Sequence, residues 1–278
     1  MILGATGFVG RHLGAALRAR GDEVTGASLR DPQTAARASA GCDAIVNLAG
    51  SPIAVRWTDK REDAMWTSRV DAPRAYLAAL ANEERRPATY VSASAVGYYG
   101  ISRTETFTEE SPPGVDFLAR LCAAWEAEAD TAATLGMRTA KIRTGLVLAP
   151  DGGVLARLLP PFRLGLGGAV ASGEQWYSWI HLADHLGIIL HALNGAGGVL
   201  NSTAPNPVRN REFTRALGAA LRRPTLFPVP AVAASLLLGE GAYVITEGQR
   251  VLPGATEASG YRFRHPELTA ALRDLLGR

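Results

Sequence analysis

Residues 1–10, MILGATGFVG, decide the fold. Gly4, Gly7 and Gly10 form a G-x-x-G-x-x-G pattern that follows a short apolar stretch and precedes a helical pattern. In a strand–turn–helix unit the first glycine permits the tight turn, the second lets the backbone approach a pyrophosphate, and the third lets the helix pack on the strand. A tight turn requires glycine whatever it binds, but the flanking patterns favour a dinucleotide-binding loop.

Outward from this loop, strand and helix patterns alternate over the first 150 residues. The strand patterns are residues 1–3, 23–28, 42–50, 89–96 and 137–150. The helical patterns are residues 11–20, 60–81 and 116–136. Such alternation is typical of a parallel sheet whose crossovers are helices. We therefore expect an α/β fold, with a Rossmann-type doubly wound parallel sheet and helices on both faces, over residues 1–150.

The strand before the loop is unusually short. Only Met1, Ile2 and Leu3 precede Gly4, whereas strands usually run about five residues. Two explanations stay open: residues have been lost from this end, or the strand is truncated in nature.

The composition of the chain changes after Pro150. Residues 152–181 are rich in Gly and Pro with interleaved aromatic residues, and residues 201–208, NSTAPNPV, are expected to form a turn-rich connection. Helical patterns lie at residues 181–193, 211–223 and 266–277. We expect residues 151–278 to form mainly a smaller substrate lobe, with some segments returning to the sheet.

Charge and hydropathy patterns argue against two classes of partner. The net charge is +3, but no basic run is longer than two residues, so no nucleic-acid partner is expected. The longest apolar run, around residues 231–238, is shorter than the roughly 20 residues that span a bilayer. No membrane partner is expected either, and the mild basicity suits an anionic cofactor.

The cysteine and lysine counts bear on compartment and source. Cys42 and Cys122 are too few for a disulfide framework and indicate a reducing cytoplasm. Lys60 and Lys141 are the only lysines, so nearly all basic residues are arginine. Because arginine codons are GC-rich, we expect a GC-rich bacterial source.

The end of the second strand bears on the choice of cofactor. An acidic residue there would hold a ribose 2′-hydroxyl, whereas an arginine would accept a 2′-phosphate. Ser28 and Arg30 favour NADP(H), and Asp31 lies one step further on. We therefore expect NADP(H) rather than NAD as the cofactor.

Several longer motifs resemble those of one family. They are GATGFVG (4–10), VNLAGSPIAVRWT (46–58), SASAVGYYG (92–100), FLARLCAAWE (117–126), LPPFRLGLGG (159–168), WIHLADH (179–185), NSTAPNPVRNREF (201–213) and EGQRVLP (247–253). Together they resemble the atypical extended short-chain dehydrogenase/reductase proteins labelled "epimerase family", which include proteins called nucleoside-diphosphate-sugar epimerases or cell-division inhibitors. The resemblance covers essentially the whole chain.

The resemblance implies a Rossmann domain, an NADP(H) site and a C-terminal substrate lobe. One departure is local: the family usually has Thr-Arg or Ser-Arg after the second strand, whereas here Leu29 separates Ser28 from Arg30. We leave open whether Arg143 faces the cofactor or pairs with an acid, but include it among the cofactor-binding candidates. These candidates are Gly4, Thr6, Gly7, Phe8, Val9, Gly10, Ser28, Arg30, Asn47, Leu48, Ala49, Gly50, Ser92 and Arg143.

The usual catalytic pair of the superfamily is missing. Typical members carry Tyr-x-x-x-Lys on a helix, where the lysine lowers the tyrosine pKa. None of the seven tyrosines is followed by lysine four residues later, and alignment on Glu126 places Leu118 and Cys122 at the two positions. The resemblance implies that this loss is common in the family.

Other residues near this helix are candidates for proton transfer. Ser94 matches the superfamily's catalytic Ser/Thr position, which hydrogen-bonds the substrate oxygen. Tyr98 and Tyr99 follow it; each either donates a proton or only walls the nicotinamide pocket. Asp71 stands where the superfamily often has an active-site asparagine.

Two further clusters have two interpretations each. His181 and His185, four residues apart, resemble a pair of metal ligands, but no third ligand is apparent, so we expect no metal. Trp176, Tyr177 and Trp179 with Phe162 form either an aromatic pocket or the packing of the lobe. The expected partner is a small molecule, apolar or aromatic in character, and the chain is either a monomer or a homodimer.

These features leave three hypotheses about function. The first is an NADP(H)-dependent oxidoreductase that acts on a carbonyl or unsaturated small molecule, with water or a tyrosine replacing the missing pair. The second is a nucleotide-sugar epimerase, which would need basic residues for a diphosphate. The third is a cofactor-binding regulator without catalysis.

Overall fold

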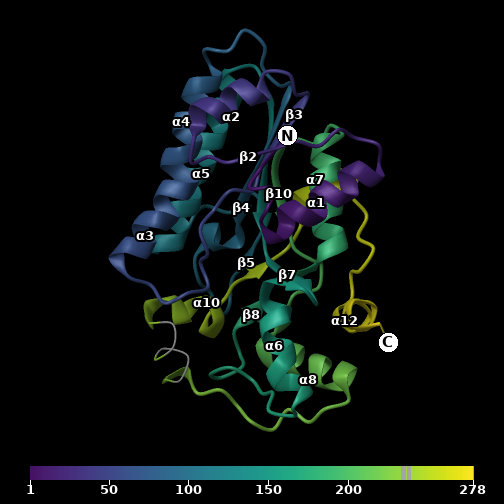
Figure 1. Cartoon of the computed structure of the whole chain (residues 1–278). Helices are drawn as coiled ribbons and strands as arrows, with labels where there is room; N and C mark the ends of the chain where they lie inside the picture. Colours follow the sequence, from purple (N-terminus) through teal and green to yellow (C-terminus); the bar gives the residue numbers. More distant parts are fainter. Residues whose placement is uncertain (233–235, 237–238, 278) are drawn as a thin grey trace.

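A six-stranded parallel sheet forms the centre of the molecule (Figure 1). The computed structural model describes residues 1–232, 236 and 239–277. The sheet strands are β1 (Ile2–Leu3), β2 (Gly26–Ala27), β3 (Ala44–Asn47), β4 (Thr89–Ala95), β6 (Arg138–Thr144) and β10 (Gly198–Ser202). Their spatial order is β10-β6-β4-β3-β1-β2, and every neighbouring pair is parallel. This arrangement confirms the predicted doubly wound sheet.

Helices cover both faces of the sheet (Figure 1). One side carries α2 (Pro32–Ser39), α3 (Asp59–Trp66), α4 (Ala72–Leu80) and α5 (Phe117–Thr134), and the other carries α1 (Phe8–Ala19) and α7 (Leu182–Leu193). Ile45 and Val46 are neighbours in β3, yet they belong to two different buried clusters. Because successive side chains point to opposite faces, one short strand contributes to both cores.

Two segments that sequence patterns treat as single units are divided in the structure. Residues 137–150 form β6 and then β7 (Leu146–Ala149), which leaves the main sheet and pairs with β9 (Trp179–His181). A Cβ on Gly145 would lie 2.2 Å from the carbonyl oxygen of Ser178, so glycine allows this close approach. The helical pattern of residues 60–81 is interrupted by a π-helical turn, η1 (Thr67–Asp71), between α3 and α4.

The last strand of the sheet differs from its prediction. Residues 201–208, expected to be a turn-rich connection, begin inside β10, which pairs with β6 from Gly198 to Ser202. The local pattern is weak because the strand has only five residues and begins with the second of two consecutive glycines. Pairing with a neighbour, rather than intrinsic propensity, makes this segment a strand.

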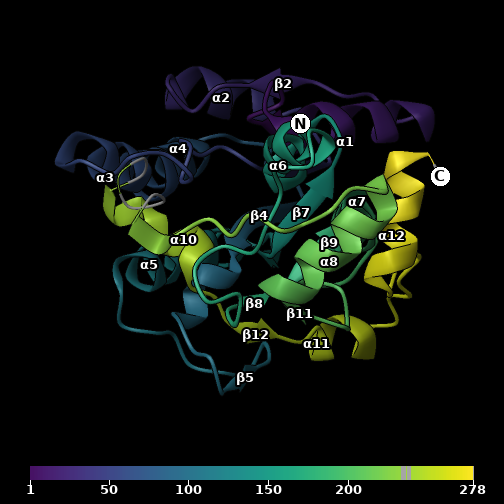
Figure 2. The ribbon, with the colours of Figure 1, turned by 90° about the horizontal axis from the view of Figure 1, so that it is seen from below.

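The remaining elements form a lobe at the carboxyl edge of the sheet (Figures 1 and 2). Its helices α6 (Gly153–Arg163), α8 (Asn210–Leu221) and α12 (Leu268–Leu276) share a third buried cluster with β7 and β9. Shorter elements are η2 (Val96–Tyr99), β5 (Thr106–Phe107), β8 (Trp176–Tyr177), β11 (Val208–Arg209), η3 (Gly239–Ala242), α10 (Tyr243–Thr246), β12 (Arg250–Val251) and α11 (Gly254–Ala258). Among the described residues, no helix has the length and apolar character needed to cross a bilayer. Most of the apolar run at residues 231–238 lies outside that described part.

Candidate functional site

The glycine loop joins β1 to α1. Gly4 has a φ angle of +84°, in the left-handed region that favours glycine. A Cβ on Gly10 would lie 2.4 Å from the carbonyl oxygen of Gly4, so only glycine allows α1 to approach the loop so closely. The loop therefore holds the amino end of α1 at the carboxyl end of β1.

The amino end of α1 offers free backbone donors. Gly7 is the N-cap and its position provides no side-chain hydrogen bond, so the amides of Phe8, Val9 and Gly10 have no acceptor within the helix. Thr6 and Gly7 are exposed, and the side chains of Phe8 and Val9 are half-buried. Free amides and the helix dipole favour an anionic group such as a pyrophosphate.

The end of β2 presents an arginine to solvent. Leu29 is buried in the core, whereas Ser28 and Arg30 on either side of it are exposed. Arg30 makes no ion pair within the described part of the chain. The carboxylate of Asp31 accepts a hydrogen bond from the Thr34 amide at 3.0 Å and so caps α2. The cation is thus free to meet a phosphate, and the neighbouring acid has a structural role.

The end of β3 lies beside the glycine loop. Asn47 is buried; its amide nitrogen donates to the Tyr90 hydroxyl, and its amide oxygen accepts from the Ala49 backbone. A Cβ on Gly4 would lie 3.0 Å from the Ala49 nitrogen, which brings the backbone of residues 48–50 against the loop. Asn47 therefore shapes this turn, and a ligand would meet the backbone after it.

A cavity of about 330 Å³ opens at the carboxyl ends of β4 and β6. Ser94 and Thr144 lie at these two strand ends, Leu121 and Trp125 belong to the α5 wall, and Tyr243 comes from α10. We call this space the apolar cavity, because its lining is mainly apolar. Its size and lining suit a small molecule with an apolar body.

The two positions of the missing catalytic pair line the apolar cavity. Leu118 and Cys122 face η2, where a Cβ on Gly97 would lie 3.3 Å from Leu118 Cβ and 3.9 Å from Cys122 Sγ. Burial raises the pKa of Cys122 to about 12, so its thiol stays protonated and is a poor nucleophile. The alignment on Glu126 therefore gives the right geometry, with residues that cannot perform the usual proton transfer.

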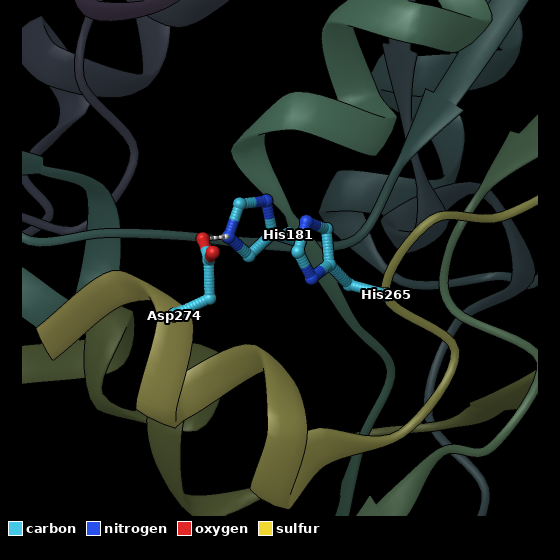
Figure 3. Close-up of side chains that lie close together, drawn as sticks. All are labelled: His181, His265 and Asp274. Atoms are coloured by element: carbon cyan, nitrogen blue, oxygen red, sulfur yellow. Dashed lines mark hydrogen bonds and ion pairs between the residues drawn. The ribbon is translucent and has the colours of Figure 1, made fainter. Parts of the chain in front are cut away.

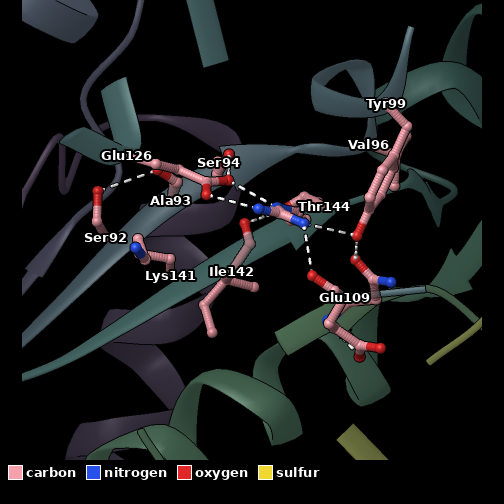
Figure 4. A network of polar contacts seen from close by, with 12 residues as sticks. Ser92, Ala93, Ser94, Val96, Tyr99, Glu109, Glu126, Lys141, Ile142 and Thr144 are labelled. Atoms are coloured by element: carbon pink, nitrogen blue, oxygen red, sulfur yellow. Dashed lines mark hydrogen bonds and ion pairs between the residues drawn. The ribbon is translucent and has the colours of Figure 1, made fainter. Parts of the chain in front are cut away.

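A buried polar network lies behind this wall (Figure 4). Ser94 donates to Glu126 Oε1 at 2.7 Å, and Arg143 forms two hydrogen bonds of 2.8 Å with the two oxygens of Glu126. Arg143 also donates to the Tyr99 hydroxyl at 2.9 Å, and that hydroxyl donates to Asn201 at 2.7 Å. Ser94 thus reaches the cavity with its proton already directed to a carboxylate.

Arg143 is paired with an acid rather than facing a cofactor. It is 3% exposed, and Glu126 opposite it is 5% exposed. Burial opposes the charge of Arg143, but the hydrogen bonds and charge of Glu126 outweigh this effect and raise its pKa. Ser92, the other candidate on this side, is buried, and its hydroxyl donates to the Ala93 carbonyl. Arg143 thus follows the second of the two alternatives left open for it, and the assignment of Ser92 to the cofactor site stays a prediction.

Tyr98 and Tyr99 lie outside the lining of the apolar cavity. Tyr98 packs against Arg143, whose Cζ lies 3.4 Å from the ring centroid. Tyr99 is 3% exposed, and burial raises its pKa to about 12. The Tyr99 hydroxyl therefore belongs to the buried network, the half-buried Tyr98 ring covers Arg143, and only Ser94 of the three catalytic candidates reaches the cavity.

An arginine that the sequence patterns did not single out does line the cavity. Arg69 in η1 is 9% exposed and donates to the Ser51 carbonyl at 2.8 Å. Its Cζ lies 5.2 Å from the Trp125 ring centroid, and a Cβ on Gly50 would lie 2.8 Å from its Nη2. Burial lowers the pKa of Arg69 to about 10, so it stays charged at neutral pH.

Asp71, which the sequence places at the superfamily's active-site asparagine position, does not face the apolar cavity. Asp71 is exposed and lies 3.7 Å from Arg74, outside the cavity lining. The π-helical turn shifts the helix face, so Arg69 rather than Asp71 faces the site. Sequence periodicity gives no sign of such a turn.

The sequence patterns also did not single out Tyr243, which lines the apolar cavity. Burial raises the pKa of Tyr243, and its hydroxyl has no hydrogen-bond partner among the described residues.

The two histidines of WIHLADH do not converge. His181 Nδ1 accepts from the Ala183 amide and caps α7, which leaves Nε2 to donate to Asp274 at 3.1 Å (Figure 3). His185 instead meets the Ser202 hydroxyl at 2.8 Å. His265 stacks on His181 with centroids 3.8 Å apart and completes a group of three potential ligands. Stacked rings direct their nitrogen lone pairs along nearly parallel planes, which is poor geometry for one ion.

The expected aromatic pocket is divided between the two interpretations. Trp176 and Tyr177 line the apolar cavity. Trp179 and Phe162 are 0% and 3% exposed and pack in the core of the lobe. β8 and β9 are adjacent in the chain but turn their aromatic side chains to these different surroundings.

Comparison with known proteins places these features in a wider group. Residues 1–201 match the NAD dependent epimerase/dehydratase family, and residues 229–275 match a domain of unknown function, DUF1731. The chloroplastic epimerase family protein SDR39U1 homolog of Arabidopsis thaliana is 40% identical, over 99% of this chain and 86% of its own length.

Two solved structures are also similar. The human epimerase family protein SDR39U1, crystallised with NADPH, has a TM-score of 0.92 and 36% identity, over 99% of this chain and 98% of its own. A nucleoside-diphosphate sugar epimerase from Corynebacterium glutamicum has a TM-score of 0.81 and 33% identity, over 99% of this chain and 57% of its own.

Proposed function

We propose, from the premise that this chain belongs to the NAD dependent epimerase/dehydratase family, that it is an NADP(H)-dependent oxidoreductase acting on a small carbonyl or unsaturated compound. One observation carries the proposal: the free amino end of α1 and the apolar cavity share one edge of the sheet. Contacts link them, from Gly4 to Ala49 and from Gly50 to Arg69. A dinucleotide along this edge would reach from the glycine loop to the cavity.

NADP(H) is the cofactor we propose. The similar human protein was crystallised with NADPH, and the donors available here fit its parts. The amides at the start of α1 would hold the pyrophosphate, Ser28 and Arg30 the 2′-phosphate, and residues 48–50 the adenosine ribose. The absence of an ion-pair partner for Arg30 in the described chain supports this assignment, since the charge is free to meet a phosphate.

The cofactor would supply a hydride, and the chain must provide orientation and a proton. Ser94 directs its proton to Glu126, so it can accept a hydrogen bond from a substrate more readily than donate one. Tyr243 lines the apolar cavity near Leu118, the position of the missing tyrosine. We propose Tyr243, or water admitted beside it, as the proton source.

Cofactor binding is the first test of this proposal. NADPH should raise the melting temperature more than NADH at equal concentration, because a native-state ligand stabilises by mass action. Arg30→Ala should weaken NADPH binding by about tenfold and leave NADH binding unchanged. Arg37→Ala, on the exposed face of α2, is the matched control. If neither nucleotide stabilises the protein, the proposal fails.

Turnover is the second test. NADPH should be consumed with a panel of apolar aldehydes, ketones and enones, and Tyr243→Phe should slow turnover at least tenfold without changing NADPH affinity. Tyr99→Phe is the control, because its hydroxyl lies in the buried network. Equal rates for wild type and Tyr243→Phe would rule out the phenol as donor.

A nucleotide-sugar epimerase is the second candidate, favoured by the similarity to the C. glutamicum protein of that name. A diphosphate needs several basic side chains, but the described lining of the apolar cavity holds one arginine, Arg69. Arg157 and Arg209 donate to backbone carbonyls, those of Ala54 and Glu174. Sugar isomerisation without net NADPH consumption would identify an epimerase, and tight NADPH binding without either reaction would identify a regulator.

The compartment and source stay predictions. Cys42 and Cys122 are both free thiols, which accords with a reducing bacterial cytoplasm. The relatives include a chloroplastic protein of Arabidopsis thaliana. The only partner we propose is the small-molecule substrate.

A further inference from the structure

Two neighbouring side chains in the wall of the apolar cavity carry hydrogen-bond donors that lack a matching acceptor among the described residues. They are Arg69 and Trp125, and both line the cavity. The guanidinium lies 5.2 Å from the Trp125 ring centroid. Among the described residues, Arg69 lacks a carboxylate counter-charge and the Trp125 N–H lacks a hydrogen-bond acceptor.

Arg69 lacks a counter-charge. Its hydrogen bonds go to neutral oxygens, the carbonyls of Ser51 and Met65 and the hydroxyl of Ser68. Among the described residues no carboxylate forms an ion pair with it, and the ionisable group that affects its pKa is the Cys122 thiol, which stays protonated. A buried charge is costly unless it is paired, so an isolated guanidinium indicates that something outside the chain completes the pair.

Trp125 lacks an acceptor. Its side chain is 6% exposed, and its indole nitrogen has no hydrogen-bond partner among the described residues. Buried indole N–H groups usually find a partner. Its position beside Arg69 makes one negatively charged oxygen group the natural acceptor for both.

The other groups on the cavity do not fill this role. Ser94 already donates to Glu126. The carboxylate of Asp116 caps α5 through the Ala119 amide, and Glu247 pairs with Arg103. The rest of the described lining is largely apolar, with Leu118 and Leu121 among its side chains. Among the described residues the cavity wall thus holds one cation, Arg69, and two donors without an acceptor, Trp125 and the Tyr243 hydroxyl proposed above as the proton source.

We propose that the apolar cavity binds a monocarboxylate with an apolar body, whose carboxylate pairs with Arg69 and accepts from Trp125. One guanidinium matches one carboxylate in charge and in its planar, bidentate shape. A diphosphate would need more positive charge than the cavity supplies. The inference rests on the proposed function and narrows its substrate class to apolar oxo acids or unsaturated acids.

The binding test uses octanoate, with octanol as the neutral analogue of equal chain length. Each is titrated by calorimetry into the full-length protein, with and without NADPH. Octanoate should bind at least tenfold more tightly than octanol. Equal affinities for octanoate and octanol would overturn the proposal.

Variants assign the effect to the two donors. Arg69→Gln should weaken octanoate binding at least tenfold and leave octanol binding unchanged, while Arg69→Lys should retain part of the preference. Trp125→Phe should weaken octanoate binding by about threefold. Arg74→Gln, three residues after the end of η1 and paired with Glu128 on the surface, should bind as the wild type does.

The outcomes separate this proposal from the proposed function. If Arg69→Gln weakens NADPH binding tenfold and leaves octanoate binding intact, Arg69 serves the cofactor and the proposal is overturned. If the protein does not bind NADPH, but its preference for octanoate over octanol depends on Arg69, the cavity assignment holds and the oxidoreductase proposal fails. Melting curves identify any variant that does not fold, in which case Arg69→Lys and the wild-type selectivity carry the test.

Discussion

Arg143 and Arg69 are both buried near α5, but among the residues that the structure describes only Arg143 has a carboxylate partner. Arg143 is 3% exposed and forms two hydrogen bonds with Glu126, whereas Arg69 is 9% exposed and meets only neutral oxygens. The raised pKa of Arg143 and the lowered pKa of Arg69 follow from this difference. One arginine completes a network inside the chain, and the other lines a cavity.

The contrast shows how two similar side chains take different roles. A buried cation with a bidentate carboxylate and further hydrogen bonds satisfies its own electrostatic requirements, so it has nothing to offer a ligand. A buried cation without a carboxylate keeps its charge available where an apolar ligand would exclude water. The place of Arg143 at the end of a predicted strand drew attention to it, yet the structure directs attention to Arg69.

The largest expected effect comes from removing the partner of Arg143. Glu126→Gln leaves that guanidinium buried without a counter-charge and should destabilise the protein by about 3–5 kcal/mol. Glu128→Gln, two residues further along α5, is the control. It breaks the surface pair with Arg74 and should cost no more than about 1 kcal/mol. Urea unfolding measures both, and equal losses would contradict the distinction.

His185 is a third buried basic residue, and unlike Arg143 and Arg69 it stays neutral. Burial lowers the pKa of His185 to about 4, below the value near 6.5 of an unfolded chain, so the unfolded state binds a proton first as the pH falls. Stability that is complete above pH 6.5 should be lost toward pH 4, with about 2 kcal/mol lost between pH 7 and 5. This part of the pH dependence should disappear in His185→Gln, measured by urea unfolding at both pH values. An identical slope in the variant would show that His185 does not carry it.

A smaller effect sharpens the boundary between network and cavity. Tyr99→Phe removes the hydroxyl that accepts from Arg143 and donates to Asn201, and should cost about 1–2 kcal/mol of stability. NADPH and octanoate affinities should stay unchanged, because Tyr99 does not line the apolar cavity. A loss of ligand affinity with stability intact would move Tyr99 into the site.

The smallest expected effect on stability is that of Arg69. Arg69→Met replaces a desolvated charge with an apolar side chain of similar length and should change the unfolding free energy by no more than about 1 kcal/mol. Octanoate binding should be lost at the same time. A destabilisation as large as that of Glu126→Gln would instead make Arg69 a structural residue like Arg143.

Local signals predicted most of the fold. Gly4 adopts a positive φ and Gly10 allows close packing, and both requirements depend on residues within the same loop. The alternation of strand and helix patterns gave the doubly wound sheet for the same reason, since side-chain periodicity is a local property. β10 was missed because its pairing with β6, more than 50 residues earlier in the chain, makes it a strand.

The site was less predictable than the fold. Ser94 and the positions of Leu118 and Cys122 were found because they lie on regular elements whose geometry fixes their direction. The role of Arg143 depended on its partner Glu126, and that of Tyr99 on its partner Asn201; both partners come from separate elements. Residue type alone does not reveal which partner a charged or phenolic group will meet.

The sequence by itself determined a glycine-loop Rossmann sheet and the loss of the tyrosine–lysine pair, because both are properties of short stretches of chain. Only the tertiary structure decided which residues lie near Leu118 and Cys122, the two positions of the missing tyrosine–lysine pair. It brings Arg69 from a π-helical turn, Trp125 from α5 and Tyr243 from α10 to one cavity. These residues come together because distant segments pack against one another, and the same packing removes water from their polar groups. Local periodicity predicts neither effect.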